Sequence, residues 1–278
     1  MKKTKLIRIN DVKDLDLTHT FECGQCFRWV PAGNGAYAGA AGDKAALISL
    51  EDGTLTIMAT GGDEEFWRNY FDLDTDYGEI KAALAAGEPR IAEACRYGSG
   101  IRILNQDPFE TIISFIISQN NNIPRIRKNI ESLCRKYGSP VEGSEELSRD
   151  GGTVYSFPAP RALAEAEVSD LADLKLGYRS GYIKASAEQY LREGCPDCRE
   201  ELLGFHGIGP KVANCIMLFG LRDTAAFPVD TWVKHIMNDM YGFGMNDVRG
   251  MQAFAAEKFG PLAGYAQQYL FYYYRDRK

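Results

Sequence analysis

The sequence predicts an α+β fold, in which an N-terminal antiparallel β-sheet domain is followed by a mostly α-helical region. Short runs of β-forming residues, separated by glycine-rich turns, occupy residues 1–60, whereas helix caps and helical periodicity prevail after Gly62. We expect the sheet domain and its flanking helices over residues 1–100 and the helical region over residues 101–278. A chain of 278 residues is long enough to give both parts a sizeable core.

Two of the predicted strands are residues 21–29, with the sequence FECGQCFRW, and residues 46–50, with the sequence ALISL. Glycine-rich turns separate such runs, at residues 33–35 and again at residues 52–53. Short β-forming segments joined by turns of this kind are typical of antiparallel hairpins.

The clearest predicted helix start is Asp107-Pro108-Phe109-Glu110. The aspartate suits the cap, the proline suits the first helical position, and Glu110 falls where the partner in a capping box would lie. The apolar run at residues 112–117 is nearly continuous, which is typical of a buried helix. Further helices are predicted at residues 64–67, 80–86, 124–137, 160–166, 168–175, 182–193, 198–203, 211–221, 231–240, 248–259 and 262–274.

Composition and charge indicate an ordinary globular protein, with 45% hydrophobic and 25% charged residues. The net charge of −6 argues against a protein that coats DNA, but not against one that binds a few phosphates through a local field. Basic residues cluster at Arg125, Arg127, Lys128, Arg135 and Lys136, which is equally typical of a solvated helix face. Without an apolar segment of signal-peptide or transmembrane type, we expect a cytoplasmic prokaryotic protein with no membrane partner.

Seven cysteines in such a chain are expected to be reduced thiols. Two pairs have CxxC spacing, Cys23/Cys26 and Cys195/Cys198, and together they could supply the four ligands of a zinc site. An isolated CxxC pair is a weak signal, so we predict no metal and no cofactor.

The most informative segment is residues 203–232, LGFHGIGPKVANCIMLFGLRDTAAFPVDTW. Gly207 and Gly209 allow backbone conformations that are closed to other residues, and Pro210 suits the first turn of the next helix. Exposed amides at such a turn, together with the helix dipole, form an anion site that reads no base sequence. A turn that requires glycine only for its shape is the structural alternative.

Lys211 and Asp230 follow this hairpin and lie 19 residues apart. Lysine has an ordinary pKa of about 10.4, but burial and the positive end of a helix both favour the neutral, nucleophilic amine. Lysine suits Schiff-base chemistry, and a carboxylate can stabilise an oxocarbenium-like charge. The alternatives are a phosphate contact for Lys211 and a helix N-cap for Asp230, and the cap is compatible with a catalytic role.

This segment resembles the helix-hairpin-helix/Gly-Pro-Asp motif of base-excision DNA glycosylases, with the two helices and their hairpin at residues 198–221. Residues 24–29 (GQCFRW), 106–123 (QDPFE through SQNNNI) and 260–271 (GPLAGYAQ through LF) narrow the resemblance to the 8-oxoguanine DNA glycosylase family. The resemblance covers most of the chain. It implies a monomeric glycosylase/lyase that acts on double-stranded DNA containing oxidised guanine, excises 8-oxoguanine preferably opposite cytosine, and nicks the strand by β-elimination through a Lys211 Schiff base.

The resemblance also implies residues that contact the lesion. The Gly24 carbonyl would accept a hydrogen bond from N7 of 8-oxoguanine, which carries a proton that guanine lacks. Gln267 would bind the Watson–Crick edge, and Phe271 and Cys215 would sandwich the flipped base. Phe271 and Cys215 lie on apolar helices, so ordinary core positions are the alternative for both.

The remaining roles implied by the resemblance concern the rest of the duplex. Contacts with the orphaned cytosine are assigned to Asn120, Arg125 and Arg179, and the wedge that fills the vacated stack is assigned to Tyr178. Phosphate contacts at the hairpin are assigned to Gly207, Gly209 and Val212.

Two departures from the family pattern affect the expected substrate range. Trp232 stands where many eukaryotic members have histidine, and Tyr272-Tyr273-Tyr274 stands where many members have an acidic residue. The open alternatives are a glycosylase for another damaged purine and a non-catalytic DNA-binding module. Covalent trapping of a Schiff base with borohydride would distinguish an enzyme from a pure binding module.

Overall fold

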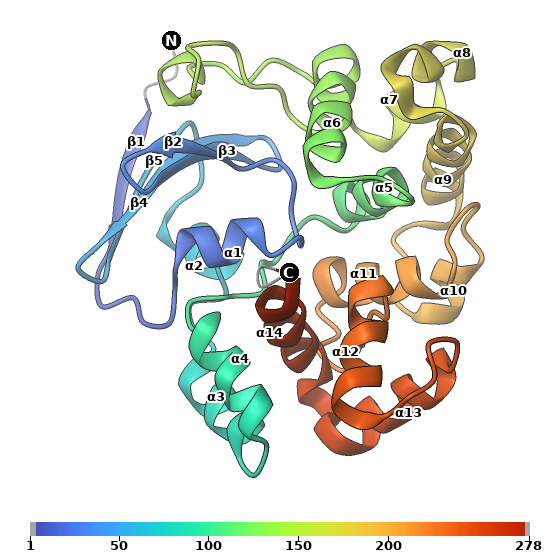
Figure 1. Ribbon diagram of the computed structural model, residues 1–278. Helices are drawn as coiled ribbons and strands as arrows, with labels where there is room; N and C mark the ends of the chain where they lie inside the picture. The colour runs from blue at the N-terminus through green and yellow to red at the C-terminus, as the bar shows by residue number, and fades with distance from the viewer. Residues whose placement is uncertain (1–3, 276–278) are drawn as a thin grey trace.

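The structure is a computed structural model that describes residues 4–275. It confirms the α+β class, because a five-stranded antiparallel sheet near the N-terminus is followed by a mostly helical region (Figure 1). The strands are β1 (Lys5–Ile9), β2 (Val30–Gly33), β3 (Ala36–Ala41), β4 (Lys44–Glu51) and β5 (Thr54–Ala59), in the spatial order β1-β5-β4-β3-β2.

Two of the predicted turns make hairpins in this sheet. Asn34 and Gly35 join β2 to β3 with φ angles of 50° and 73°, and Asp52 and Gly53 join β4 to β5 with φ angles of 47° and 74°. Two successive residues with positive φ match the right-handed twist of antiparallel strands, and Asn-Gly and Asp-Gly are the favoured pairs there. Residues 46–50 lie in β4, as predicted.

The prediction of a strand at residues 21–29 was wrong. Helix α1 (Leu17–Glu22) covers the first two of these residues, and an irregular turn that includes Gly24, with φ of +84°, follows it. The aromatic residues of this run, Phe21, Phe27 and Trp29, are all buried, although the run does not form a strand. The Phe21 and Trp29 rings stack with centroids 4.7 Å apart in the core beneath the sheet.

The helices of the described region closely follow the predicted pattern, although α1 and α4 were not predicted. Their bounds are α2 (Glu64–Tyr70), α3 (Tyr77–Ala85), α4 (Pro89–Tyr97), α5 (Pro108–Ser118), α6 (Ile123–Tyr137), α7 (Pro160–Ala164), α8 (Val168–Leu171), α9 (Arg179–Glu193), α10 (Arg199–Leu203), α11 (Pro210–Gly220), α12 (Thr231–Tyr241), α13 (Val248–Phe259) and α14 (Ala263–Arg275). Within residues 4–275, no helix combines the length and apolar character needed to cross a bilayer.

Helix α5 is the buried helix that the sequence predicts, and it packs against α6, α9 and α11. Asp107 caps it by accepting a hydrogen bond from the Glu110 amide at 2.8 Å, with Pro108 in the first turn. The expected capping box is not completed, because the Glu110 carboxylate forms a buried ion pair with Arg28 at 3.3 Å instead. This pair links α5 to the segment that leads into the sheet.

The extended segment at residues 101–107 joins the sheet core to the helical core. Ile101 and Ile103 pack into the helical core, whereas Leu104 packs into the sheet core. Alternate side chains of an extended segment point in opposite directions, so one short stretch contributes to both cores. The turn that contains Gly24 lies against this same segment, because the Gln25 side chain donates a hydrogen bond to the Arg102 carbonyl and accepts one from the Leu104 amide.

Candidate active site

The glycine hairpin, residues 206–210, joins α10 to α11 as the sequence predicts. Gly207 has φ of +82°, and a Cβ atom at this position would overlap the Tyr182 ring, so both backbone and packing require glycine. Gly209 caps α11 without a side chain, and Pro210 occupies the first helical position. The amides of the first turn, including that of Val212, therefore have no side-chain cap, although the Val212 side chain itself is buried.

Lys211, Cys215 and Asp230 form one electrostatically linked group. Lys211 and Cys215 lie one turn apart on the same face of α11, and the Lys211 ammonium is 5.7 Å from the centroid of the Phe115 ring on α5. Asp230 caps α12, because its Oδ1 accepts a hydrogen bond from the Val233 amide at 2.8 Å. The N-cap proposed from the sequence is thus present, and it fixes the carboxylate beside the lysine.

The expectation that its surroundings favour a neutral Lys211 was wrong for this state of the protein. Its pKa is raised above the ordinary value by Cys215 and then by Asp230, which together outweigh the opposing effect of burial. Burial raises the pKa of the Cys215 thiol, and it also raises that of Asp230 against the lowering effect of the Val233 amide and Lys211. Lys211 is therefore cationic at neutral pH.

A second group joins the turn after α1 to helix α14. A Cβ atom built on Gly24 would lie 3.6 Å from the Phe271 ring, so the structure brings these two predicted residues into contact. Gln267 lies one turn earlier on α14 and is only 5% exposed. Among the described residues, its buried Oε1 atom has no hydrogen-bond partner. A buried polar atom of this kind costs about 1–3 kcal/mol unless a ligand satisfies it.

Gln25 holds the Gly24 turn in place, and sequence analysis did not single it out. Its side-chain amide donates to the carbonyls of Thr20 at 2.8 Å and Arg102 at 2.7 Å, and its Oε1 accepts from the Leu104 amide at 2.8 Å. The sequence gives no clear signal for this role, because Glu22 and Arg28 make the run mixed in polarity and two of the partners, Arg102 and Leu104, lie too far along the chain to be inferred from spacing.

The predicted opposite-strand residues lie near the end of α5 and the starts of α6 and α9. Tyr178 is 54% exposed, and the Arg179 guanidinium carbon lies 4.6 Å from the centroid of its ring. Arg179 is only 6% exposed and donates to the carbonyls of Gln119 and Asn120, the latter at 3.2 Å. Arg125 is exposed in the first turn of α6. No hydrogen bond in the described chain joins these residues directly to the Lys211 group.

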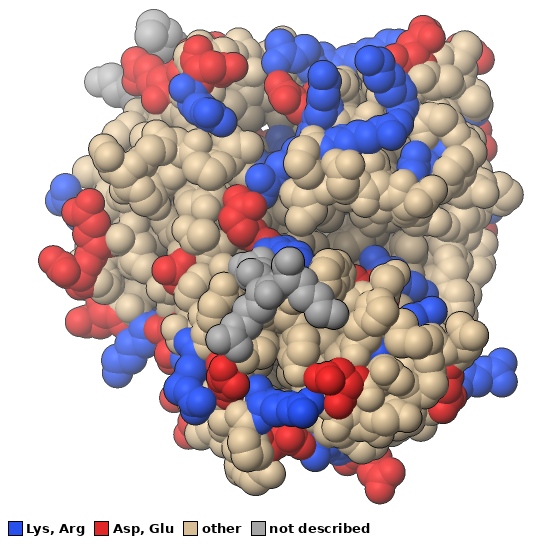
Figure 2. Space-filling view, viewed as in Figure 1, with Lys and Arg blue, Asp and Glu red and all other residues tan. Residues whose placement is uncertain are grey.

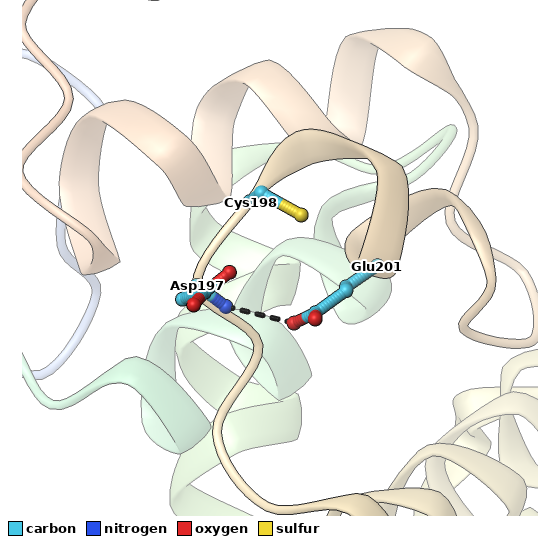
Figure 3. Close-up of side chains that lie close together, drawn as sticks. All are labelled: Asp197, Cys198 and Glu201. Atoms are coloured by element: carbon cyan, nitrogen blue, oxygen red, sulfur yellow. Dashed lines mark hydrogen bonds between the residues drawn. The ribbon is translucent and has the colours of Figure 1, made fainter.

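The four cysteines of the two CxxC pairs do not form one metal site. Cys23 is buried in the helical core and Cys26 in the sheet core, whereas Cys195 is exposed and Cys198 half-buried. In residues 4–275, one group of three possible ligands is found, namely Asp197, Cys198 and Glu201, whose ligand atoms lie within 4.8 Å of one another (Figure 3). Glu201 already accepts a hydrogen bond from the Asp197 amide at 3.0 Å, and a structural zinc site requires four ligands, so we assign no metal here.

Two family models match consecutive parts of the chain. Residues 7–112 match the N-terminal domain of 8-oxoguanine DNA glycosylase, and residues 113–261 match the HhH-GPD superfamily of base-excision DNA repair proteins. The chain belongs to the 8-oxoguanine DNA glycosylase family. As a member of this family, it is a DNA N-glycosylase and DNA lyase of base-excision repair.

Similar proteins come from archaea, bacteria and plants. A probable N-glycosylase/DNA lyase of Methanothermobacter thermautotrophicus is 37% identical over 231 residues, which is 72% of this chain and 71% of that protein. The N-glycosylase/DNA lyase of Arabidopsis thaliana is 28% identical, covering 93% of this chain and 77% of its own. The Clostridium acetobutylicum 8-oxoguanine glycosylase/lyase, solved with double-stranded DNA containing cytosine opposite 8-oxoguanine, is 39% identical with a TM-score of 0.89, and covers 100% of this chain and 99% of that one.

Proposed function

We propose that this enzyme excises 8-oxoguanine from duplex DNA through a Schiff base on Lys211, nicks the strand by β-elimination, and prefers cytosine opposite the lesion. The observation that carries the proposal is the group formed by Lys211, Cys215 and Asp230 beside the glycine hairpin. The full-length similarity to the Clostridium glycosylase/lyase supports the same substrate.

In the proposed reaction, Lys211 must first lose its proton, because only the neutral amine can attack. The amine then bonds to C1′ of the deoxyribose as the N-glycosidic bond breaks, and the departing base takes up a proton. Opening of the sugar ring gives the Schiff base. Loss of a C2′ proton then breaks the C3′–O bond and leaves a 5′-phosphate on the downstream strand, and water releases the enzyme.

Asp230 has two functions in this proposal. Its carboxylate stabilises the positive charge that develops on the sugar as the base departs. Its hydrogen bond from the Val233 amide fixes that carboxylate at the start of α12. Asp230 also contributes to the raised pKa of Lys211, which keeps the amine protonated in the free enzyme.

In this proposal, two groups bind the edges of the base by hydrogen bonds, and two side chains pack against its faces. The Gly24 carbonyl would accept a hydrogen bond from N7–H of 8-oxoguanine and repel the N7 lone pair of guanine, a difference of about 1–3 kcal/mol. The unpartnered Oε1 of Gln267 supports a role for this residue at the Watson–Crick edge. Phe271 and Cys215 would form the walls on the two faces of the flipped base.

The opposite strand would be read by Asn120, Arg125 and Arg179, with Tyr178 filling the vacated stack. Arginine donors suit the acceptor edge of cytosine. Because Arg179 donates to protein carbonyls in the free enzyme, it would have to exchange at least one of these partners for the orphaned base.

Phosphate binding is proposed for the backbone at Gly207, Gly209 and Val212, because the uncapped amides there form the positive end of α11. Figure 2 shows basic side chains gathered over α6 and acidic side chains along the outer edge of the sheet. A local basic cluster of this kind lets a protein with a net charge of −6 attract DNA locally.

The decisive experiment incubates wild type and Lys211→Gln with borohydride and a duplex that contains 8-oxoguanine opposite cytosine. A covalent adduct with wild type that is absent with the variant is the expected result. An adduct that persists in Lys211→Gln would refute the assigned nucleophile. No adduct and no excision with wild type would refute the substrate, and other damaged purines would then be assayed.

A further inference from the structure

We propose that Gln119 is a positioning residue that couples the glycine hairpin to the loop reading the base opposite the lesion, and so sets the opposite-base preference. The inference rests on the proposed function, because it concerns how that preference is built. Gln119 lies at the C-terminal end of α5 and is not among the residues that the family resemblance assigned.

Gln119 makes long-range hydrogen bonds in two directions. Its side-chain Nε2 donates to the Gly207 carbonyl in the glycine hairpin at 3.0 Å, across 88 positions in the sequence. Its own backbone carbonyl accepts from Nε of Arg179 at 3.0 Å and also from Nη2 of the same guanidinium. One residue therefore connects the proposed phosphate site to a proposed reader of the orphaned cytosine.

Both partners of Gln119 have little freedom to move. Gly207 has a left-handed backbone and lies directly against the Tyr182 ring, which itself packs against Tyr178 with ring centroids 5.5 Å apart. Arg179 is buried and packs against Tyr178. Gln119 thus connects two restrained groups, Gly207 through its side-chain amide and Arg179 through its backbone carbonyl.

The loop after Gln119 depends on this anchor. Asn120 has φ of +48°, a conformation that asparagine tolerates but that needs support. The other side-chain bonds of this loop within residues 119–122 are local: Asn121 Nδ2 donates to the Ile117 carbonyl at 3.1 Å, and Asn122 caps α6. Without the bond to Gly207, only Arg179 would tie the loop to a distant part of the described chain.

The expected consequence is a loss of selectivity rather than a loss of chemistry. Gln119 does not contact the Lys211 group through any hydrogen bond in the described residues, so removal of its donor should leave the single-turnover rate opposite cytosine within about twofold of wild type. The ratio of kcat/KM opposite cytosine to kcat/KM opposite adenine should fall about three- to tenfold, the effect of losing one hydrogen bond.

The test uses Gln119→Met, which keeps the length of the side chain but has no donor, and Gln119→Asn, which keeps the amide but is too short to reach Gly207. The matched control is Gln189→Met on α9, where the amide donates to Glu193 on the surface at 2.7 Å. Both Gln119 variants should lower the cytosine-to-adenine ratio, and the control should not. Combining Gln119→Met with Arg179→Lys should lower the ratio no further than Arg179→Lys alone.

The possible failures of this experiment are separable. A wild-type preference for cytosine that both Gln119 variants retain would overturn the coupling and leave the proposed function standing. An equal fall in kcat/KM opposite both bases would also overturn it, because that result indicates a general structural defect. A wild-type enzyme without any opposite-base preference would contradict that part of the proposed function and this inference with it.

Discussion

In the proposed reaction, the charge on Lys211 controls how the rate of Schiff-base formation depends on pH. A raised pKa keeps the amine protonated at neutral pH, and the nucleophilic fraction grows as the pH rises toward that pKa. The single-turnover rate of adduct formation should therefore increase between about pH 6 and pH 9. Asp230→Asn removes a carboxylate that helps to raise this pKa, so the pH at which the rate begins to rise should be lower. A rate that is flat over this range would contradict a cationic resting lysine.

Replacement of Gln267 by leucine should raise the stability of the protein and lower its activity. Gln267→Leu removes a buried oxygen that has no protein partner, so the free energy of unfolding should rise by about 1 kcal/mol. The value of kcat/KM on 8-oxoguanine should fall at least tenfold, because the same oxygen is proposed to bind the base. Urea unfolding and excision assays measure the two effects.

The neighbouring Gln268 is the matched control for this prediction. It is equally buried, but its side-chain amide donates to the Cys23 sulfur at 3.6 Å. Gln268→Leu should therefore lower the free energy of unfolding by about 1 kcal/mol. Equal stability effects for the two leucine variants would argue against an unsatisfied Gln267 in the free enzyme.

At the scale of elements, the buried ion pair between Arg28 and Glu110 holds α5 to the segment before β2. Arg28→Met leaves the Glu110 carboxylate buried and unpaired, which should lower the free energy of unfolding at pH 7 by about 3–5 kcal/mol. Burial already raises the pKa of Glu110, and loss of Arg28 raises it further. A group with a raised folded-state pKa favours the folded state at low pH, so the loss should be smaller at pH 5 than at pH 7.

Denaturant unfolding at both pH values tests the ion pair. The double variant Arg28→Met with Glu110→Leu should recover much of the lost stability, because neither charge then remains buried. A destabilisation by Arg28→Met that is equal at pH 5 and pH 7 would indicate that lost packing, rather than the unpaired carboxylate, is responsible.

The elements that the sequence predicts well are those set by local contacts. Asp63, Asp107 and Asp230 each cap a helix through an amide three residues later, so a few neighbouring residues contain the whole signal. The run at residues 21–29 was misjudged because aromatic residues suit both a strand and a buried turn. Only packing against the rest of the molecule distinguishes these two structures.

In the candidate site, too, the features set within one segment could be predicted from the sequence, and those set by distant contacts could not. The hairpin and the pairing of Lys211 with Asp230 follow from one segment of sequence. The direction of the Lys211 pKa shift could not be predicted, because it reflects a balance between burial and two neighbouring groups. The bond from Gln119 to Gly207 was equally inaccessible, because its two ends are distant in sequence and glutamine has no single preferred role.

At the scale of the whole molecule, the local basic surface over α6 should make DNA affinity depend steeply on salt despite the net charge of −6. Lys128→Ala should weaken binding to undamaged duplex and reduce the slope of log affinity against log salt by about 1. The single-turnover rate at saturating enzyme should not change. Fluorescence anisotropy at several salt concentrations measures the slope, and an unchanged slope would place Lys128 outside the DNA interface.

The contact between Gly24 and Phe271 joins opposite ends of the chain, whereas the glycine hairpin forms within one short segment. Partial unfolding that separates the sheet from α14 would destroy this contact and leave the hairpin intact. If Gly24 and Phe271 read the base as proposed, mild heat or denaturant should yield molecules that still bind DNA but no longer distinguish oxidised guanine from normal guanine. We therefore expect the ability to discriminate between bases, rather than DNA affinity, to be lost first when the fold is damaged.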